Sequence, residues 1–164
     1  MIIGICGPTG AGKTAIADKL SKEIGYKVIS QDDYFLSKPP NYYNNFPVWE
    51  TPDALDMWQF YRNLVRAQSN IIVEGFLLYV DERIRNLIKP KIFIDITNRT
   101  LISRRISRNG RIQSDDYINN IIVPISNCYA LIQKGYSDII VHGEQSIDTI
   151  YENILIYLKE CSGK

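Results

Sequence analysis

The segment Gly7-Pro8-Thr9-Gly10-Ala11-Gly12-Lys13-Thr14 combines residue types that together can bind a polyphosphate. It matches the pattern G-x-x-x-x-G-K-S/T at each fixed position. Glycines let successive backbone N–H groups turn inward, a lysine reaches the β- and γ-phosphates, and a threonine hydroxyl is a ligand for Mg²⁺. The pattern predicts a nucleoside triphosphate site whose contacts come from Gly7, Thr9, Gly10, Ala11, Gly12, Lys13 and Thr14.

The same glycines allow a second interpretation. Gly10-x-Gly12-x-x-Ala15 fits the looser dinucleotide fingerprint, and Asp32 follows about 20 residues later, as that fingerprint requires. A dinucleotide site needs neither an ammonium group nor a hydroxyl directly after the last glycine, whereas a triphosphate with Mg²⁺ needs both. Lys13 and Thr14 therefore favour the triphosphate.

Carboxylates follow two further apolar runs, Asp32-Asp33 after one and Glu74 at the end of the next. Asp32 or Asp33 could accept the proton of an incoming hydroxyl while Lys13, Mg²⁺ and arginines absorb the phosphoryl charge. A turn or capping role is the alternative for both aspartates. Glu74 could hold a Mg²⁺-bound water or form a salt bridge, since either would offset the burial of its charge.

Arginines are densest around Asn109-Gly110. A basic helix end followed by a glycine break is typical of a lid that closes over phosphates, here at about residues 105–116. A solvated helix face is the alternative. Nucleic-acid binding is not expected, because no aromatic residues alternate with these arginines. The cluster consists of Arg104, Arg105, Arg108 and Arg111.

Strands and helices are predicted to alternate along the chain. Strands are expected at 1–6, 26–30, 70–74, 91–96 and 137–141. Helices are expected at 13–24, from Pro52 to Val65, and at 82–88, 97–108, 115–133 and 146–160, with Pro124 kinking or splitting its helix. Residues 36–47 are predicted to form an irregular loop. Short apolar strands between helices indicate an α/β fold, a five-stranded parallel sheet covered on both faces.

Length, composition and net charge limit the possible classes of protein. A chain of 164 residues is expected to form a single domain, and a net charge of +1 gives no field that attracts nucleic acid or anionic membrane. Three scattered cysteines and a single histidine favour reduced thiols and disfavour a metal cluster. No apolar run approaches about 18 residues and no cleavable leader is recognisable. We therefore expect a cytoplasmic or nuclear protein, monomeric or homodimeric, with small-molecule partners.

Together these residues resemble the uridine kinase superfamily of nucleoside kinases, and most closely the nicotinamide riboside kinases, over nearly the whole chain. Besides the phosphate loop, the resemblance rests on S-Q-D-D-Y-F at 30–35, W-E-T-P-D-A-L-D at 49–56 and E-G-F-L-L-Y at 74–79. It also includes R-R-I-S-R at 104–108, followed by Tyr117, Pro124 and Tyr129. The lid is shorter than in uridine kinases.

The resemblance implies a P-loop fold with an arginine-bearing lid, and an enzyme that uses ATP and Mg²⁺ to phosphorylate the 5′-hydroxyl of a riboside. Nicotinamide riboside is the first expectation. Asp32 would be the base, Glu74 would act through Mg²⁺ and its waters, and Trp49 would stack on the base or pyridine ring. Glu50 would hold the ribose hydroxyls.

The other implied roles divide between the two substrates. Arg105 and Arg108 would serve the transferring phosphoryl group, and Arg104 and Arg108 the ATP. Further acceptor contacts are expected at Asp33, Phe35, Asn119 and Tyr129.

Three positions depart from the family pattern. The ribose-binding aspartate of the family is Glu50 here, one methylene longer. Thr51 replaces a histidine that is frequent in uridine kinases, which weighs against uracil or cytosine. Asn119 stands where riboside kinases tend to have an aspartate.

Alternatives remain. A uridine/cytidine kinase is the alternative within enzymes. A non-catalytic nucleotide-binding module is the alternative of another class, because Glu50 could mark a lost acceptor site. A GTP-driven switch is disfavoured, since the chain has neither N-K-x-D nor D-x-x-G.

Overall fold

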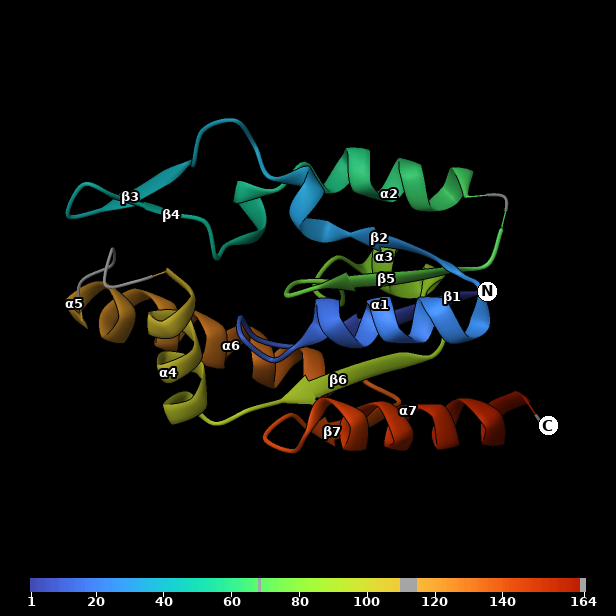
Figure 1. Cartoon of the computed structure of the whole chain (residues 1–164). Helices are drawn as coiled ribbons and strands as arrows, with labels where there is room; N and C mark the ends of the chain where they lie inside the picture. Colours follow the sequence, from blue (N-terminus) through green and yellow to red (C-terminus); the bar gives the residue numbers. More distant parts are fainter. Residues whose placement is uncertain (68, 110–114, 163–164) are drawn as a thin grey trace.

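A sheet of five parallel strands, in the order β2-β5-β1-β6-β7, forms the centre of the computed structural model (Figure 1). The structure describes residues 1–67, 69–109 and 115–162 of the chain. The predicted parallel sheet is confirmed. Its strands are β1 (Ile2–Cys6), β2 (Lys27–Ser30), β5 (Ile71–Gly75), β6 (Lys91–Asp95) and β7 (Ile139–His142).

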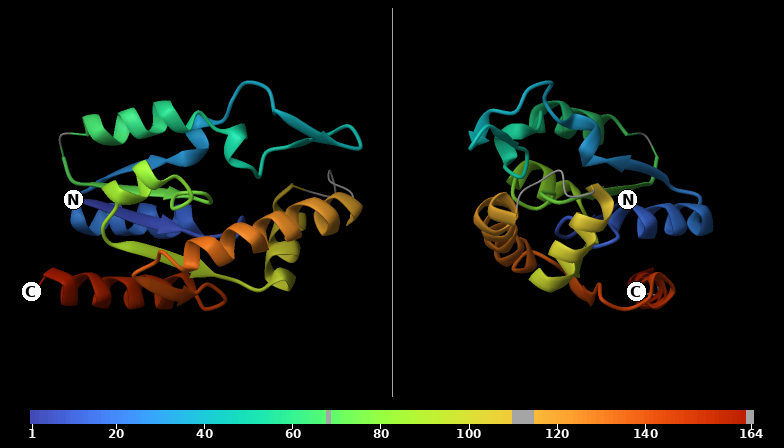
Figure 2. Two further views of the ribbon diagram at one scale, coloured as in Figure 1. Left: turned by 180° about the vertical axis from the view of Figure 1, so that it is seen from behind. Right: turned by 60° about the vertical axis from the view of Figure 1, so that its left-hand side comes forward.

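Helices cover both faces of the sheet (Figures 1 and 2). Ile5 and Ile72 belong to the core on one face, and Val73 and Phe93 to the core on the other. Burial on both faces explains why the strands read as continuous apolar runs. The first face packs on α1 (Lys13–Ile24) and α7 (Ile147–Ser162); the second packs on α2 (Met57–Arg66), α3 (Glu82–Leu87) and α6 (Val123–Lys134).

Residues 36–47 are not irregular, contrary to the sequence prediction. They contain most of an antiparallel hairpin formed by β3 (Asn41–Tyr43) and β4 (Phe46–Val48). Asn44 and Asn45 turn the hairpin with φ of 46° and 66°. Asparagine adopts this left-handed conformation readily, and two such residues in succession suit a tight hairpin turn. The asparagines that indicated a loop are therefore its turn signal.

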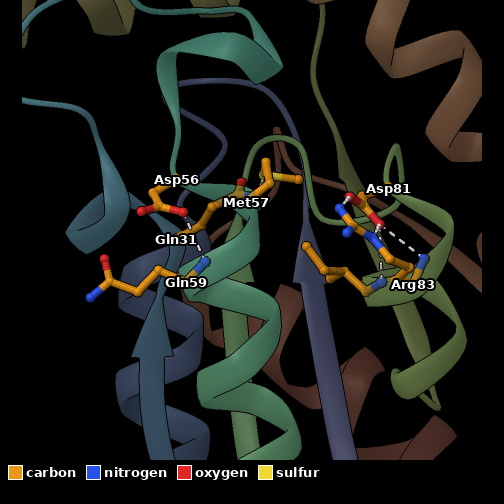
Figure 3. Close-up of polar contacts among 7 residues, drawn as sticks. Gln31, Asp56, Met57, Gln59, Asp81 and Arg83 are labelled. Atoms are coloured by element: carbon orange, nitrogen blue, oxygen red, sulfur yellow. Dashed lines mark hydrogen bonds and ion pairs between the residues drawn. The ribbon is translucent and has the colours of Figure 1, made fainter.

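Helix α2 begins later than predicted. Pro52–Ala54 forms a separate 3₁₀ turn, and α2 starts at Met57. Asp56 caps the helix, because its Oδ1 accepts a hydrogen bond of 2.8 Å from the backbone N–H of Gln59 (Figure 3).

Pro124 splits its helix, as predicted. Helix α5 (Asp115–Tyr117) continues into a π turn at Ile118–Ile122, which leads directly into α6. Proline lacks an N–H and its ring collides with the carbonyl four residues earlier, so a wider turn before it relieves the clash.

The hairpin packs against the helices that flank the predicted lid. Val48, Leu101, Tyr117 and Ile122 form a small buried cluster, separate from the two sheet cores. Leu101 belongs to α4 (Asn98–Asn109). The cluster thus joins the hairpin to α4, α5 and the π turn, at the end of the sheet opposite the labelled termini (Figure 1).

None of the helices within the described residues is long and apolar enough to span a bilayer.

Candidate active site

A cleft of about 520 Å³ opens at the carboxyl ends of β1, β2 and β5. It brings together the phosphate loop, three of the predicted carboxylates and much of the predicted acceptor site. Its walls consist of Thr9, Gly10, Gly12, Lys13, Thr14, Ala15, Asp32, Phe35, Trp49, Glu50, Glu74, Phe76 and Arg105. Ligands bind at this position in parallel α/β sheets.

The phosphate loop joins β1 directly to the first turn of α1. Gly10 has a φ of 78°, a left-handed conformation that favours glycine. The Lys13 ammonium donates a hydrogen bond of 3.0 Å to the carbonyl oxygen of Pro8 and so lies across the loop. A helix N-terminus and an ammonium group beside the same loop suit an anion.

Arg104 contacts this loop from α4. Its guanidinium donates to the carbonyl oxygens of Gly10, at 2.8 Å, and Gly143, at 3.1 Å. A Cβ atom at Gly10 would lie 3.2 Å from the Arg104 Cβ. Arg104 therefore connects α4 to the phosphate loop, and its predicted contact with ATP stays a prediction.

The two aspartates after β2 lie in different surroundings. They belong to a 3₁₀ turn, Gln31–Tyr34, which is capped by Ser30: its Oγ accepts from the Asp32 N–H at 3.3 Å. Asp32 lines the cleft and Asp33 does not. Because Ser30 is the cap, neither aspartate is needed for that role.

Gln31 fixes the position of this turn and was not predicted. Its side chain is fully buried, and its Oε1 accepts from the Leu77 N–H at 2.9 Å. A Cβ at Gly75 would lie 2.5 Å from Gln31 Oε1. The glycine after Glu74 therefore makes room for the glutamine that holds the Asp32 turn, and Figure 3 shows Gln31 beside Met57 of α2.

Glu74 is 2% exposed and lines the cleft. Its Oε1 accepts a hydrogen bond from the Ser30 hydroxyl, and it forms no ion pair with any described residue. The salt bridge, which was the alternative to a Mg²⁺ role for Glu74, is thus absent from the described part of the chain.

The donor groups at this place fit Mg²⁺. Thr14 supplies a hydroxyl oxygen and Glu74 a carboxylate in the same cleft. Mg²⁺ is usually bound through one or two carboxylates together with substrate phosphates and waters. Over residues 1–67, 69–109 and 115–162, no three histidine, cysteine or acidic side chains gather as a self-sufficient metal site.

Glu50 is held by three donors. Its Oε1 lies 2.7 Å from Arg105 Nη2, and its Oε2 lies 3.1 Å from the Trp49 N–H and 3.2 Å from the Tyr117 hydroxyl. The Glu50 and Arg105 side chains are each 12% exposed. Arg105 therefore contacts the predicted ribose-binding carboxylate in this structure.

Aromatic rings form one wall of the cleft. Phe35 lies edge-on to Trp49, with ring centroids 5.6 Å apart, and stacks with Phe76 at 6.0 Å and 23°. Phe76 was not predicted as a site residue. Gln133 on α6 positions it by donating to its carbonyl oxygen at 2.8 Å. The available sequence signal was Gln133, a polar residue that directly follows the apolar residues 130–132.

Other predicted site residues lie outside the main cleft or outside the residues that the structure describes. Tyr129 lines a small adjoining cavity of about 30 Å³ with Glu50 and Phe76. Asn119 is exposed on the π turn and lines neither cavity. The Arg108 side chain, Arg111 and residues 110–114 of the predicted lid lie outside the described residues.

A parallel sheet with a phosphate loop between β1 and α1, and a carboxylate-lined cleft above it, defines the class of P-loop phosphotransferases. The sequence profile described as "AAA domain" matches residues 3–120. The chain is 30% identical to a protein named uridine kinase from Borrelia duttonii, over 98% of this chain and 97% of that protein. The chain belongs to the uridine kinase-like family of P-loop kinases, and it is a phosphotransferase.

Solved structures agree on the fold. Shikimate kinase from Aquifex aeolicus superposes with a TM-score of 0.62 at 19% identity, covering 99% of this chain and 98% of that one. A possible uridine kinase from Bacillus stearothermophilus gives a TM-score of 0.61 at 17% identity, with 86% and 88% covered. P-loop kinases use ATP and Mg²⁺, which the phosphate loop and the Thr14–Glu74 oxygens can hold.

Proposed function

We propose that this protein transfers the γ-phosphoryl group of ATP, with Mg²⁺, to the 5′-hydroxyl of a riboside, and that the acceptor is nicotinamide riboside. The observation that carries the proposal is the shared cleft: Lys13 and Thr14 lie on the donor side, and Asp32, Trp49 and Glu50 line the same space.

Each group has a defined part in this reaction. ATP with Mg²⁺ supplies the activated phosphoryl group and part of the charge neutralisation when bound. Lys13 neutralises the charge on the transferring group, and the loop N–H groups orient the phosphates. Asp32 accepts the proton of the 5′-hydroxyl; it is an exposed carboxylate on the cleft wall, free of the capping role that Ser30 fills.

The acceptor side holds groups for both parts of a riboside. Glu50 and Arg105 offer an acceptor and a donor to the ribose hydroxyls, and Phe35 and Trp49 offer flat surfaces to the ring. Nicotinamide riboside carries a positively charged ring, which aromatic faces attract.

Uridine is the second candidate. Sequence similarity favours uridine as the acceptor, because the similar proteins from Borrelia duttonii and Chlamydia pneumoniae are both named uridine kinase. The aromatic wall accommodates a pyrimidine as well as a pyridine ring. Thr51, in place of the histidine frequent in uridine kinases, weighs against it.

Acceptor-dependent turnover tests the proposal. The purified protein is incubated with ATP and Mg²⁺ and with nicotinamide riboside, uridine, cytidine or no acceptor, and products are identified by mass spectrometry. We expect phosphorylated nicotinamide riboside and no product from Lys13→Ala. Exclusive phosphorylation of uridine or cytidine would support the second candidate, and ATP binding without any acceptor-dependent product would mean a non-catalytic module.

All the residues proposed for this reaction come from one chain, so a monomer suffices and a homodimer is compatible. The relatives are bacterial, which is compatible with a cytoplasmic location and gives no support to a nuclear one.

A further inference from the structure

Tyr117 connects three parts of the acceptor side. Its ring is fully buried and packs against Tyr43 and Phe46 of the hairpin, with centroids 6.4 Å and 5.6 Å away. Its hydroxyl lies 2.7 Å from the carbonyl oxygen of Pro47 and 3.2 Å from Glu50 Oε2. One side chain therefore links α5, the hairpin and the predicted ribose-binding carboxylate.

The Tyr117 hydroxyl stays protonated and can therefore donate a hydrogen bond. Burial raises the pKa of Tyr117 above its usual value, and the charge of Glu50 raises it further. Its single proton faces two acceptors, the Pro47 carbonyl and Glu50 Oε2. The two acceptors share this proton in a bifurcated hydrogen bond, whose arm to the Pro47 carbonyl is the shorter and whose arm to Glu50 is the longer.

Glu50 needs such support because of its length. A glutamate has one more rotatable bond than the aspartate of the family pattern, so its carboxylate is less restricted by the backbone. Arg105 holds Oε1 and comes from α4, whereas Tyr117 and the Trp49 N–H hold Oε2. Donors on both oxygens restrict the rotation of the carboxylate.

We propose that Tyr117 is a positioning residue for acceptor recognition. It acts through Glu50: its hydroxyl orients the carboxylate so that the remaining lone pairs face the ribose hydroxyls in the cleft. This inference rests on the proposed function, and it assigns the preference for a ribose over a 2′-deoxyribose to a residue that does not line the cleft.

Tyr117→Phe separates this role from packing, because it keeps the ring and removes only the hydroxyl. We expect KM for the riboside to rise about ten-fold, the usual effect of losing a hydrogen bond to a charged group. KM for ATP should change little, and the melting temperature should fall by a few degrees, because the Pro47 carbonyl also loses its donor. The preference for riboside over 2′-deoxyriboside should fall, since the deoxy substrate makes less use of Glu50.

Tyr43→Phe is the matched control, since it removes a hydroxyl from the same aromatic cluster, and Tyr43 lies beside Tyr117 rather than Glu50. It should leave the acceptor preference unchanged. In a Glu50→Ala background, Tyr117→Phe should cause no further rise of KM for the riboside, because the effect of Tyr117 on the acceptor passes through that carboxylate.

Two results would overturn the inference. An equal fall of kcat with all acceptors, in both the wild-type and Glu50→Ala backgrounds, would mean a purely structural tyrosine. An unchanged riboside preference in Tyr117→Phe would mean that Glu50 is positioned without it. If the wild-type protein phosphorylates no riboside, the proposed function itself fails, and this inference fails with it.

Discussion

At the scale of single residues, the two aspartates after β2 occupy different positions relative to the cleft. A 3₁₀ turn places successive side chains about 120° apart, so Asp32 and Asp33 cannot face the same space. Asp32 lines the cleft and Asp33 is exposed outside it. Adjacent residues of the same type therefore make a matched pair for testing the base.

We predict that Asp32→Asn lowers kcat by roughly 10² to 10⁴ while ATP binds almost as before, because a general base is lost and the phosphate loop is intact. Steady-state kinetics and nucleotide binding measure the two effects. Asp33→Asn is the control and should retain most activity. A larger loss from Asp33→Asn than from Asp32→Asn would refute the assignment of the base.

Residue spacing could predict much of this site but not its long-range contacts. The phosphate-loop pattern and the carboxylates at strand ends led to Lys13, Thr14, Asp32 and Glu74, all of which line the cleft. The Arg105–Glu50 pair joins residues that are 55 positions apart. Such a pairing depends on how α4 packs on the acceptor loop, and no local pattern encodes it.

At the scale of elements, the helix starts depend on side-chain caps. Asp81 caps α3: its Oδ1 accepts from the Arg83 N–H at 2.9 Å, and its Oδ2 lies 2.6 Å from Arg83 Nη2 (Figure 3). The hydrogen bond from the Arg83 side chain lowers the pKa of Asp81 most strongly. A carboxyl whose pKa falls on folding stabilises the fold above its unfolded pKa and loses that contribution as the pH falls.

We predict that Asp81→Ala lowers the free energy of unfolding by about 1 kcal/mol at pH 7, the usual cost of a lost N-cap. The difference from wild type should shrink at pH 3, because this pH lies below the ordinary aspartate pKa of 3.8 and protonation of Asp81 in the unfolded wild-type chain stabilises the unfolded state. Urea denaturation at the two pH values measures this. A difference that is the same at both would mean that the charge of Asp81 contributes nothing.

Two glycines with positive φ differ in what surrounds them. Gly10 and Gly25 have φ of 78° and 72°. A Cβ at Gly10 would lie 3.2 Å from the Arg104 Cβ, whereas a Cβ at Gly25 would have nothing within 4 Å. Their alanine variants therefore share the backbone strain and differ in the effect on the phosphate loop.

We predict that Gly10→Ala and Gly25→Ala each destabilise the protein by about 1 kcal/mol, through the left-handed backbone. Only Gly10→Ala should also weaken ATP binding, because it displaces Arg104 or the loop. Thermal denaturation and nucleotide titration separate the two effects. Equal ATP affinities in both variants would mean that the Arg104 contact does not shape the site.

Most strands and helices could be predicted from the sequence, because the apolar runs form the buried strands and the segments with helical periodicity form the helices. Helix α1 has the predicted bounds, Lys13–Ile24. The hairpin was missed because prolines and asparagines weigh toward loops, although Asn44 and Asn45 form its turn. Helix α2 was placed too early because Pro52 suits a first helical turn, and it starts a 3₁₀ turn instead.

At the scale of the whole molecule, the reactivity of the Cys6 thiol can be used to measure how often the buried sheet opens. It is fully buried at the end of β1, its Sγ donates to Gln133 Oε1 at 3.0 Å, and burial raises its pKa to about 12. Cys128 and Cys161 are exposed. A thiol reagent can therefore reach two of the cysteines in the folded protein, and the third only when the core opens.

We predict rapid labelling of Cys128 and Cys161 and slow labelling of Cys6, followed site by site with mass spectrometry. ATP with Mg²⁺ should slow the labelling of Cys6 further, by about 100-fold at a concentration 100 times Kd, because ligand binding stabilises the folded state. Labelling of Cys6 as fast as that of the exposed thiols would contradict its burial. No effect of ATP, under conditions where nucleotide titration shows that it binds, would mean that Cys6 becomes accessible through a local opening that leaves the nucleotide site intact.

The parallel sheet was predictable, since buried strands alternate with helices along the chain. The strand order β2-β5-β1-β6-β7 could not be predicted, because short apolar strands of similar length contain no residue pattern that specifies which strands are adjacent. This order places β2 and β5 side by side, with Ser30 opposite Glu74. The site therefore depends on a property of the whole sheet.

The central claim is that an acceptor hydroxyl lies between Asp32 and the terminal phosphate of the donor. A crystal structure with a non-hydrolysable ATP analogue, Mg²⁺ and nicotinamide riboside tests it directly. The account predicts a carboxylate oxygen of Asp32 about 3 Å from the 5′-oxygen, which faces the terminal phosphorus held at Lys13. A 5′-oxygen directed away from Asp32, or an acceptor bound outside the cleft, would contradict it.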